Sequence, residues 1–150
     1  MRSVLFVCTA NQCRSPMAMA ILKAKTEETP GDWKIESAGT WAVEGAPANQ
    51  RTQQVLAELA LDLSDHRSRM VTGEMLAGFN LILVMEPGHK EALQIEFPEA
   101  ARRIYLISEM IGLSFTIVDP VGGEIEGYRA TVREIDGILT EGMDRIKSLA

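Results

Sequence analysis

The sequence predicts an α/β fold, an open parallel sheet of about four strands with helices on both faces. Short apolar runs rich in β-branched and aromatic residues alternate along the chain with longer segments whose apolar residues recur every three or four positions. The first short run, at 4–7, is apolar throughout, as a strand covered on both faces tends to be. Right-handed crossovers would place helices on each face, and ligands in such folds bind at the carboxyl ends of the strands.

The first strand and the first helix are predicted to flank a polar loop. The strand at 4–7 ends at Cys8, and the loop runs from there to Ser15-Pro16. Serine is a good N-cap and proline suits the first helical position, so this pair predicts a helix over 16–28.

The middle of the chain continues the alternation. Residues 34–37 alternate like a strand and lead into a glycine-containing turn. A helix is predicted over 47–61, with its buried face formed by Val55, Leu56 and Leu59.

The second half contains two more strands and two more helices. The clearest strand of the sequence lies at 79–85, Glu86-Pro87 begins a helix, and 103–107 is predicted to be a further strand. One long final helix is predicted from the spacing of Ile125, Tyr128, Val132, Ile135, Leu139, Met143 and Ile146.

Composition limits the classes of function. A chain of 150 residues with 46% hydrophobic and 24% charged residues predicts one globular domain over 1–150. Its 15 basic and 21 acidic residues give a net charge of −6, which argues against nucleic-acid binding. The apolar stretch at 81–85 is far short of the roughly 20 residues of a membrane helix. We therefore expect no nucleic-acid or membrane partner, and a monomer, since the sheet accounts for the apolar helix faces.

The cysteines and histidines suggest neither a disulfide framework nor a metal centre. Cys8 and Cys13 lie too close together to brace a large loop, which favours a reducing, cytoplasmic location. The two histidines are scattered and no zinc-ligand spacing occurs, so no cofactor is predicted. His89, at the start of a predicted helix, is expected to be solvated and receives no role.

The loop from Cys8 to Pro16 has the order of parts that an anion site requires. A loop between a strand end and a helix start points backbone N–H groups inward, and the helix adds partial positive charge. Arg14 can add a planar fork that matches two phosphate oxygens, and the same positive field favours thiolate over thiol at Cys8. A cysteine at a strand end, taken alone, is as readily a small core residue.

The residues of this loop, Cys8-Thr9-Ala10-Asn11-Gln12-Cys13-Arg14-Ser15-Pro16, resemble the active-site loop of the low-molecular-weight protein tyrosine phosphatases. Further matches follow in the family's order at 37–40, 66–69, 81–86 and Asp119-Pro120. The resemblance implies that Cys8 is the nucleophile, Arg14 the phosphate clamp and Asp119 the general acid and base. A phosphorylated protein would be the substrate, and phosphate or sulfate would bind in the loop.

The resemblance also implies roles for the surrounding residues. The phosphate-binding loop would consist of Thr9, Ala10, Asn11, Gln12, Cys13 and Ser15. Asn11 and Ser15 would also hold this loop in shape, together with Ser37 and His66. Ser15 could donate a hydrogen bond to the Cys8 sulfur or act only as a helix cap. Cys13 is either a buried filler or, by resemblance, a disulfide partner that spares Cys8 from over-oxidation. The position of Trp41 resembles that of an aromatic residue at the rim of the family's substrate pocket, which implies a weak role in substrate binding.

Three features depart from the tyrosine-directed pattern. Ala10 stands where the family usually has glycine, which would cost roughly 1 kcal/mol if the position needs a positive φ. Val121-Gly122-Gly123 follows Asp119-Pro120 where eukaryotic-type members place aromatics, which thins the wall around a phenyl ring. Gln12 fits neither the larger apolar residue of tyrosine-directed members nor the threonine of the arginine-directed branch.

Other functions remain open. The two glycines after Val121 also resemble bacterial protein arginine phosphatases, which share the fold. A thioredoxin-coupled arsenate reductase is less favoured because it needs two further cysteines. A module that binds phosphorylated partners without turnover is a further alternative. Nucleotide binding is weaker still, because the sequence contains neither a G-x-G-x-x-G nor a Walker loop.

Overall fold

The computed structural model describes residues 1–150 and has a four-stranded parallel sheet at its centre, in the order β2-β1-β3-β4. The strands are β1 (Arg2–Cys8), β2 (Trp33–Gly39), β3 (Leu81–Val84) and β4 (Ile104–Leu106). The α/β fold and the parallel sheet of four strands predicted from the sequence are confirmed. All four residues of β3 are buried, which is why this strand appears in the sequence as a continuous apolar run.

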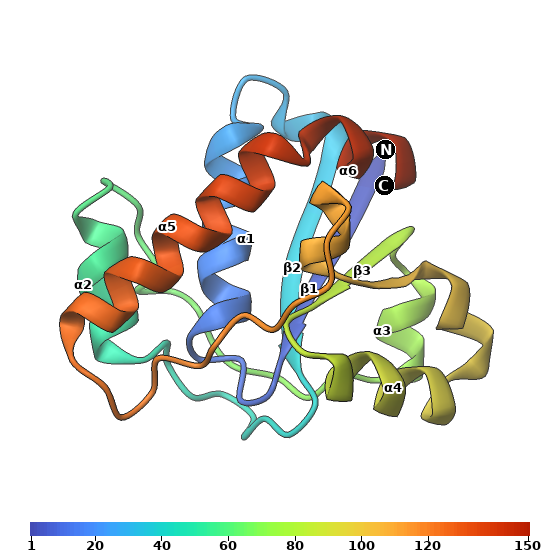
Figure 1. The fold of residues 1–150 in the computed structure, drawn as a ribbon, viewed down its shortest axis with the longest axis horizontal. Coiled ribbons are helices and arrows are strands. Elements are labelled where there is room, and N and C mark those ends of the chain that lie inside the picture. Colours follow the sequence, from blue (N-terminus) through green and yellow to red (C-terminus); the bar gives the residue numbers. More distant parts are fainter.

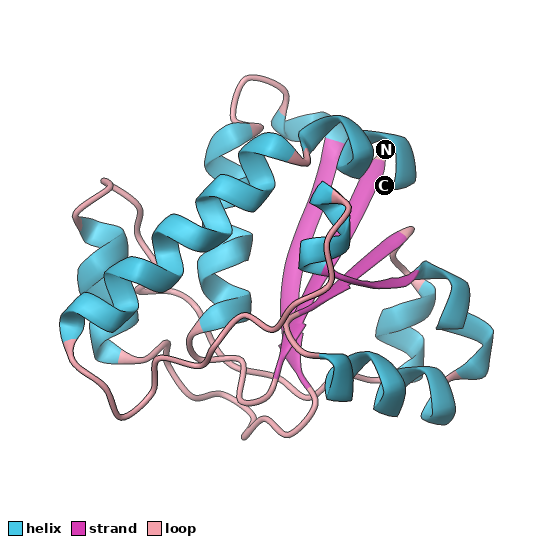
Figure 2. Ribbon diagram, in the orientation of Figure 1, coloured by secondary structure: helices cyan, strands magenta, loops and turns pink.

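Helices cover both faces of the sheet (Figures 1 and 2). On one face α1 (Arg14–Lys25) and α5 (Ile125–Glu141) pack on a core that includes Val4 and Phe6, with α2 (Gln50–Ala57) and α6 (Met143–Leu149) beside them. On the other face α3 (Gly73–Ala77) and α4 (Pro87–Glu96) lie over a core that includes Leu5 and Val7. Alternate residues of β1 therefore enter different cores. Three short 3₁₀ helices complete the chain: η1 (Pro30–Asp32), η2 (Pro98–Arg103) and η3 (Ile107–Ile111).

Several helix limits differ from the predicted ones. The first helix spans Arg14–Lys25 rather than 16–28, and the second spans Gln50–Ala57 rather than 47–61. Leu59, expected on the buried face of the second helix, lies beyond its end with 52% of its surface exposed. The short helix α3 had no counterpart in the sequence prediction.

The predicted long C-terminal helix is two helices that meet at Gly142. A Cβ atom at this position would lie 2.8 Å from Cβ of Met110 and 2.9 Å from the carbonyl oxygen of Ile138. Both α5 and α6 pack against η3 on either side of this glycine. The apolar spacing persists across the break because both helices bury one face. No helix of the chain has the length and apolar character needed to cross a membrane.

Candidate active site

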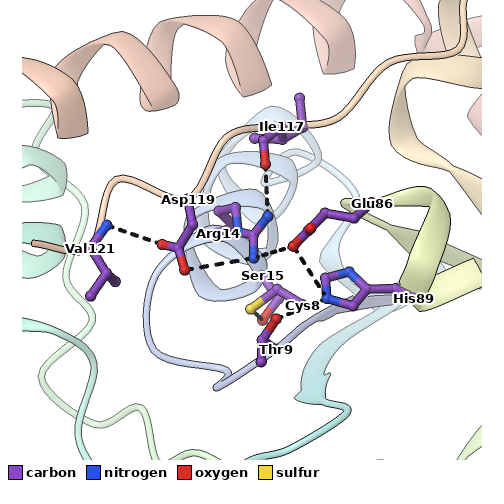
Figure 3. A network of polar contacts seen from close by, with 9 residues as sticks. All are labelled: Cys8, Thr9, Arg14, Ser15, Glu86, His89, Ile117, Asp119 and Val121. Atoms are coloured by element: carbon purple, nitrogen blue, oxygen red, sulfur yellow. Dashed lines mark hydrogen bonds and ion pairs between the residues drawn. The ribbon is translucent and has the colours of Figure 1, made fainter.

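The carboxyl ends of the strands carry the loop between β1 and α1, which forms one wall of a cavity of about 230 Å³. The predicted nucleophile, clamp and acid meet at this cavity (Figure 3). Its lining residues are Cys8, Thr9, Ala10, Gln12, Cys13, Arg14, Asn49, Glu86, Asp119 and Val121. Residues more than a hundred positions apart therefore contribute to one site.

The carbonyl groups of the loop bind to surrounding backbone and side chains. None of the backbone N–H groups of residues 9–13 donates to a protein acceptor. They remain available to an anion in the cavity, next to the N-terminus of a twelve-residue helix. The carbonyl contacts run from Thr40 N to Cys8 O (2.9 Å), from Trp41 N to Thr9 O (2.9 Å), from His66 Nε2 to Asn11 O (2.8 Å) and from Asn49 N to Gln12 O (2.9 Å).

Asn11 holds the loop's turn. It is fully buried with a φ of 58°, and its side-chain amide donates to Ser15 Oγ at 2.8 Å and Ser37 Oγ at 2.9 Å. Its Oδ1 accepts the backbone N–H of Arg69 at 3.1 Å. Asparagine tolerates the left-handed region better than most residues. The positive φ therefore falls on Asn11 and not on Ala10, so the strain considered for alanine does not arise.

The Cys8 sulfur lies 3.0 Å from Ser15 Oγ in the buried base of the cavity. The expectation that Ser15 caps the helix is wrong, because α1 begins at Arg14 and its N-cap position is Cys13, which makes no side-chain cap. Ser15 instead lies in the first turn with its hydroxyl turned toward the sulfur. A hydroxyl donating to the sulfur would stabilise negative charge there.

Arg14 is buried, with 2% of its surface exposed, and its guanidinium is fixed from two sides. Nη1 donates to the carbonyl of Ile117 at 2.7 Å, and Nη2 lies 2.8 Å from Glu86 Oε2. Asp119 Oδ2 lies farther away, 3.8 Å from the same Nη2. These contacts orient the planar group at the cavity before any anion arrives.

Asp119 stands across the cavity from the loop on the segment between η3 and α5 (Figure 3). Its Oδ1 accepts the backbone N–H of Val121 at 3.1 Å, which fixes the carboxyl group in the Asp-Pro turn. Its side chain keeps 45% exposure, so the carboxyl group can exchange protons with water.

Cys13 is a buried free thiol in the wall of the cavity. Burial raises its pKa to about 11, and the hydroxyl of Thr52 acts in the opposite direction. Cys13 is therefore neutral at physiological pH. Its pairing with Cys8 stays a prediction.

His66 supports the loop from outside the cavity through its hydrogen bond to Asn11 O. Burial lowers its pKa below the ordinary value, and the charges of Arg69 and Arg67 act in the same direction. A neutral ring with its proton on Nε2 satisfies the carbonyl.

Two residues of the site were missed by the sequence prediction. Glu86 joins the guanidinium of Arg14, and His89, expected in solvent, is buried with Nε2 2.9 Å from Thr9 Oγ1. Both lie at the start of α4, which the tertiary fold brings against the loop. The sequence signal was limited to an acidic residue and a histidine three positions apart around a helix-starting proline.

The aromatic rim expected at Trp41 does not line the cavity. Trp41 is 79% exposed and none of the lining residues is aromatic. Gln12 lines the cavity as expected, and Val121 and Asn49 complete its edge. No group of three or more histidine, cysteine or acidic side chains in the chain is arranged to hold a metal ion.

Comparison with known proteins agrees with this geometry. The family described as "Low molecular weight phosphotyrosine protein phosphatase" matches residues 3–149. The protein-arginine-phosphatase of Geobacillus stearothermophilus is 36% identical over 97% of this chain and 96% of its own. The low molecular weight protein tyrosine phosphatase from T. tengcongensis superposes with a TM-score of 0.91 at 40% identity, over 97% of this chain and 99% of that one. Wzb from Escherichia coli K30, a tyrosine phosphatase solved in complex with sulphate, has a TM-score of 0.85 at 26% identity, over 99% of this chain and 98% of that one.

Proposed function

The chain belongs to the low molecular weight phosphotyrosine protein phosphatase family, and we propose that it hydrolyses phosphotyrosine in proteins through a cysteinyl-phosphate intermediate. The observation that carries the proposal is the Cys8 sulfur at the base of a loop whose amides lack protein acceptors, with Arg14 beside it and a carboxyl group opposite. Wzb with its bound sulphate and the T. tengcongensis tyrosine phosphatase, both similar to this chain, support it.

In the first half of the reaction the phosphate dianion would bind in the loop. The free amides of residues 9–13 and the guanidinium of Arg14 would bind its oxygens and stabilise the charge that moves during transfer. Cys8 would attack phosphorus in line while the bond to the tyrosine oxygen breaks. Asp119 would give its proton to that oxygen, a contribution typically of 10²- to 10⁴-fold.

In the second half the same groups would hydrolyse the intermediate. Asp119, now a carboxylate, would take a proton from a water molecule that attacks the cysteinyl phosphate. The sulfur–phosphorus bond would break, inorganic phosphate would leave, and Cys8 would return as a thiolate that Ser15 stabilises. The exposure of Asp119 gives that water direct access to its carboxyl group.

Phosphoarginine is a second candidate substrate, favoured by the walls of the cavity. No aromatic side chain lines it, while two carboxyl groups, Glu86 and Asp119, do. A phosphoarginine carries a guanidinium next to its phosphoryl group, and carboxylates are its natural partners. The protein-arginine-phosphatase of Geobacillus stearothermophilus is also among the similar proteins.

A substrate panel tests both proposals. Peptides with phosphotyrosine and phosphoarginine in the same sequence context would be compared by release of inorganic phosphate, with p-nitrophenyl phosphate as reference. We expect hydrolysis of phosphotyrosine that is lost in Cys8→Ser. A higher kcat/KM on phosphoarginine would favour the second candidate, and equal turnover by Cys8→Ser would refute the cysteine mechanism.

A further inference from the structure

The ring of His89 contacts the side chain of Thr9, a residue of the phosphate-binding loop. His89 occupies the first turn of α4, is buried, and does not itself line the cavity. Its Nε2 lies 2.9 Å from Thr9 Oγ1 and 3.5 Å from Glu86 Oε2 (Figure 3). Thr9 does line the cavity, and His89 is the only protein partner of its hydroxyl group.

The surroundings of the ring determine which nitrogen carries the proton. His89 Nδ1 is buried without a hydrogen-bond partner. A proton on Nδ1 would leave a buried N–H group unsatisfied, a rarer and costlier arrangement than an unused lone pair. The Glu86 carboxylate near Nε2 repels a lone pair and favours an N–H group at that nitrogen. Of the two neutral forms of the ring, both features favour the one with its proton on Nε2.

A hydroxyl group that accepts a hydrogen bond from His89 Nε2 can still donate its own hydrogen to another acceptor. Thr9 Oγ1 would accept from His89 Nε2 and could direct its hydrogen into the cavity, where the phosphate oxygens are expected. This donor would add to the backbone amides of the loop.

We propose that His89 is a positioning residue that, as the Nε2–H tautomer, turns the Thr9 hydroxyl proton toward a bound phosphoryl oxygen. The inference rests on the proposed function, because it concerns the oxyanion partners of the same site. In this arrangement His89 donates a hydrogen bond to Thr9, and Thr9 donates one to the phosphoryl group.

Burial keeps the His89 ring neutral at neutral pH against the two carboxylates that face it. Glu86, from its own helix, and Asp119, from the segment after η3, favour a proton on the ring, whereas Arg14 at the start of α1 opposes it. Burial, together with Arg14, outweighs the two carboxylates and lowers the pKa of His89 below its ordinary value. Glu86 also binds Arg14, so one carboxylate orients both the clamp and the histidine behind Thr9.

The first measurement reads the tautomer. Nitrogen-15 NMR of the imidazole rings in the wild-type protein, with and without inorganic phosphate, distinguishes a protonated Nε2 from a protonated Nδ1. We expect His89 to carry its proton on Nε2 in both states. A ring protonated on Nδ1 would overturn the proposal, whether or not the protein is a phosphatase.

The second measurement is a double-mutant cycle on binding of inorganic phosphate, followed by calorimetry, and on kcat/KM for p-nitrophenyl phosphate. Thr9→Val and His89→Ala should each weaken both quantities about ten- to a hundredfold, the usual effect of losing a hydrogen bond to a charged group. The double variant should lose no more than Thr9→Val alone, and Thr9→Ser, which keeps the hydroxyl, should stay close to wild type.

Control variants separate this coupling from damage to the fold. Glu91→Gln changes an exposed residue of the same helix and should leave phosphate binding unchanged. Additive losses in the double variant, or full phosphate affinity in Thr9→Val, would contradict the proposal. A wild-type protein that binds phosphate but hydrolyses nothing would refute the proposed function, while the tautomer and the binding cycle would still decide the role of His89.

Discussion

The Ser15 hydroxyl oxygen lies 3.0 Å from the Cys8 sulfur. It also accepts the side-chain amide of Asn11 at 2.8 Å, so its single proton is left for donation. The competing acceptor, the carbonyl of Ala38, is farther away at 3.3 Å. When the sulfur is charged, Ser15 therefore donates to it.

Ser15→Ala should lower kcat on p-nitrophenyl phosphate about ten- to a hundredfold, because a hydrogen bond to a charged group is lost. Ser148→Ala, at an exposed position of α6, is the matched control and should keep full activity. Urea unfolding of both variants would show whether the loss comes from the fold. Wild-type kcat in Ser15→Ala would exclude this hydroxyl from the mechanism.

Gly39→Ala should abolish phosphate binding. A Cβ atom at Gly39 would lie 2.4 Å from the carbonyl oxygen of Thr9 and 3.0 Å from the backbone nitrogen of Asn11, so the loop must move. Because the clash is with backbone, no side-chain rotation can relieve it.

The control for this prediction is Gly137→Ala on α5, where a Cβ atom meets nothing within 4 Å. That variant should bind phosphate normally and gain about 0.5–1 kcal/mol in free energy of unfolding, since glycine weakens a helix interior. Calorimetric titration with phosphate and urea unfolding check both statements. Normal phosphate affinity in Gly39→Ala would show that the loop does not need this close approach.

The strands were predictable because each is buried and apolar over a short run, as β3 shows. The first helix was placed two residues late because Ser15-Pro16 has the local signature of a cap. In the structure the contact of Ser15 with Cys8 prevails over local capping, and the helix begins at Arg14. The local capping rule fails here at a residue of the candidate site.

The sequence singled out Cys8, Arg14 and Asp119 through a strand–loop–helix pattern and a resemblance, and the structure brings all three to one cavity. Glu86 and His89 were not singled out, since only the packing of α4 against the first loop turns them toward the guanidinium and Thr9. The break at Gly142 was hidden for a similar reason, because the neighbouring Met110 lies in another part of the sequence.

The stability of the protein should fall as the pH drops below about 6.5, in part through His66. Burial lowers the pKa of His66 from an ordinary value of 6.5 in the folded state. The unfolded chain therefore binds a proton at a pH where the folded chain does not, and acid favours unfolding. The stabilising contribution is fully present above the ordinary value and is lost as pH falls toward the folded-state pKa.

The test compares the free energy of unfolding in urea at pH 7.5 and pH 5.0 for wild type and His66→Gln. Glutamine keeps an N–H donor for the carbonyl of Asn11 but does not titrate. The variant should therefore lose less stability than wild type between pH 7.5 and pH 5.0. Residual pH dependence is expected, because burial also lowers the pKa of His89. Equal losses in the two proteins would remove His66 as a source.

The two cysteines should differ in reactivity. Burial raises the pKa of Cys13 to about 11, so it stays a thiol over the whole range in which alkylation is practical. Iodoacetamide at pH 7–9 should therefore modify Cys8 alone, and inorganic phosphate should protect it. Peptide mapping by mass spectrometry at several pH values measures the labelling of both cysteines. Equal labelling of Cys13 and Cys8 at pH 8 would contradict the assignment of Cys13 as a neutral thiol.

Asp119→Asn should affect poor leaving groups more than good ones. Phenoxide is a strong base and needs a proton as it departs, whereas p-nitrophenolate leaves readily as an anion. The loss of a general acid should therefore slow the hydrolysis of phenyl phosphate more. We expect a decrease in kcat/KM of about 10²- to 10⁴-fold on phenyl phosphate and a smaller one on p-nitrophenyl phosphate. Asp144→Asn, an exposed residue of α6, should change neither. Because Asp119 Oδ2 is 3.8 Å from Arg14 whereas Glu86 Oε2 is at 2.8 Å, Asp119 is the less tightly paired carboxylate. An equal decrease on the two substrates would mean that another group supplies the proton, and Glu86 would then be the next carboxyl group to replace.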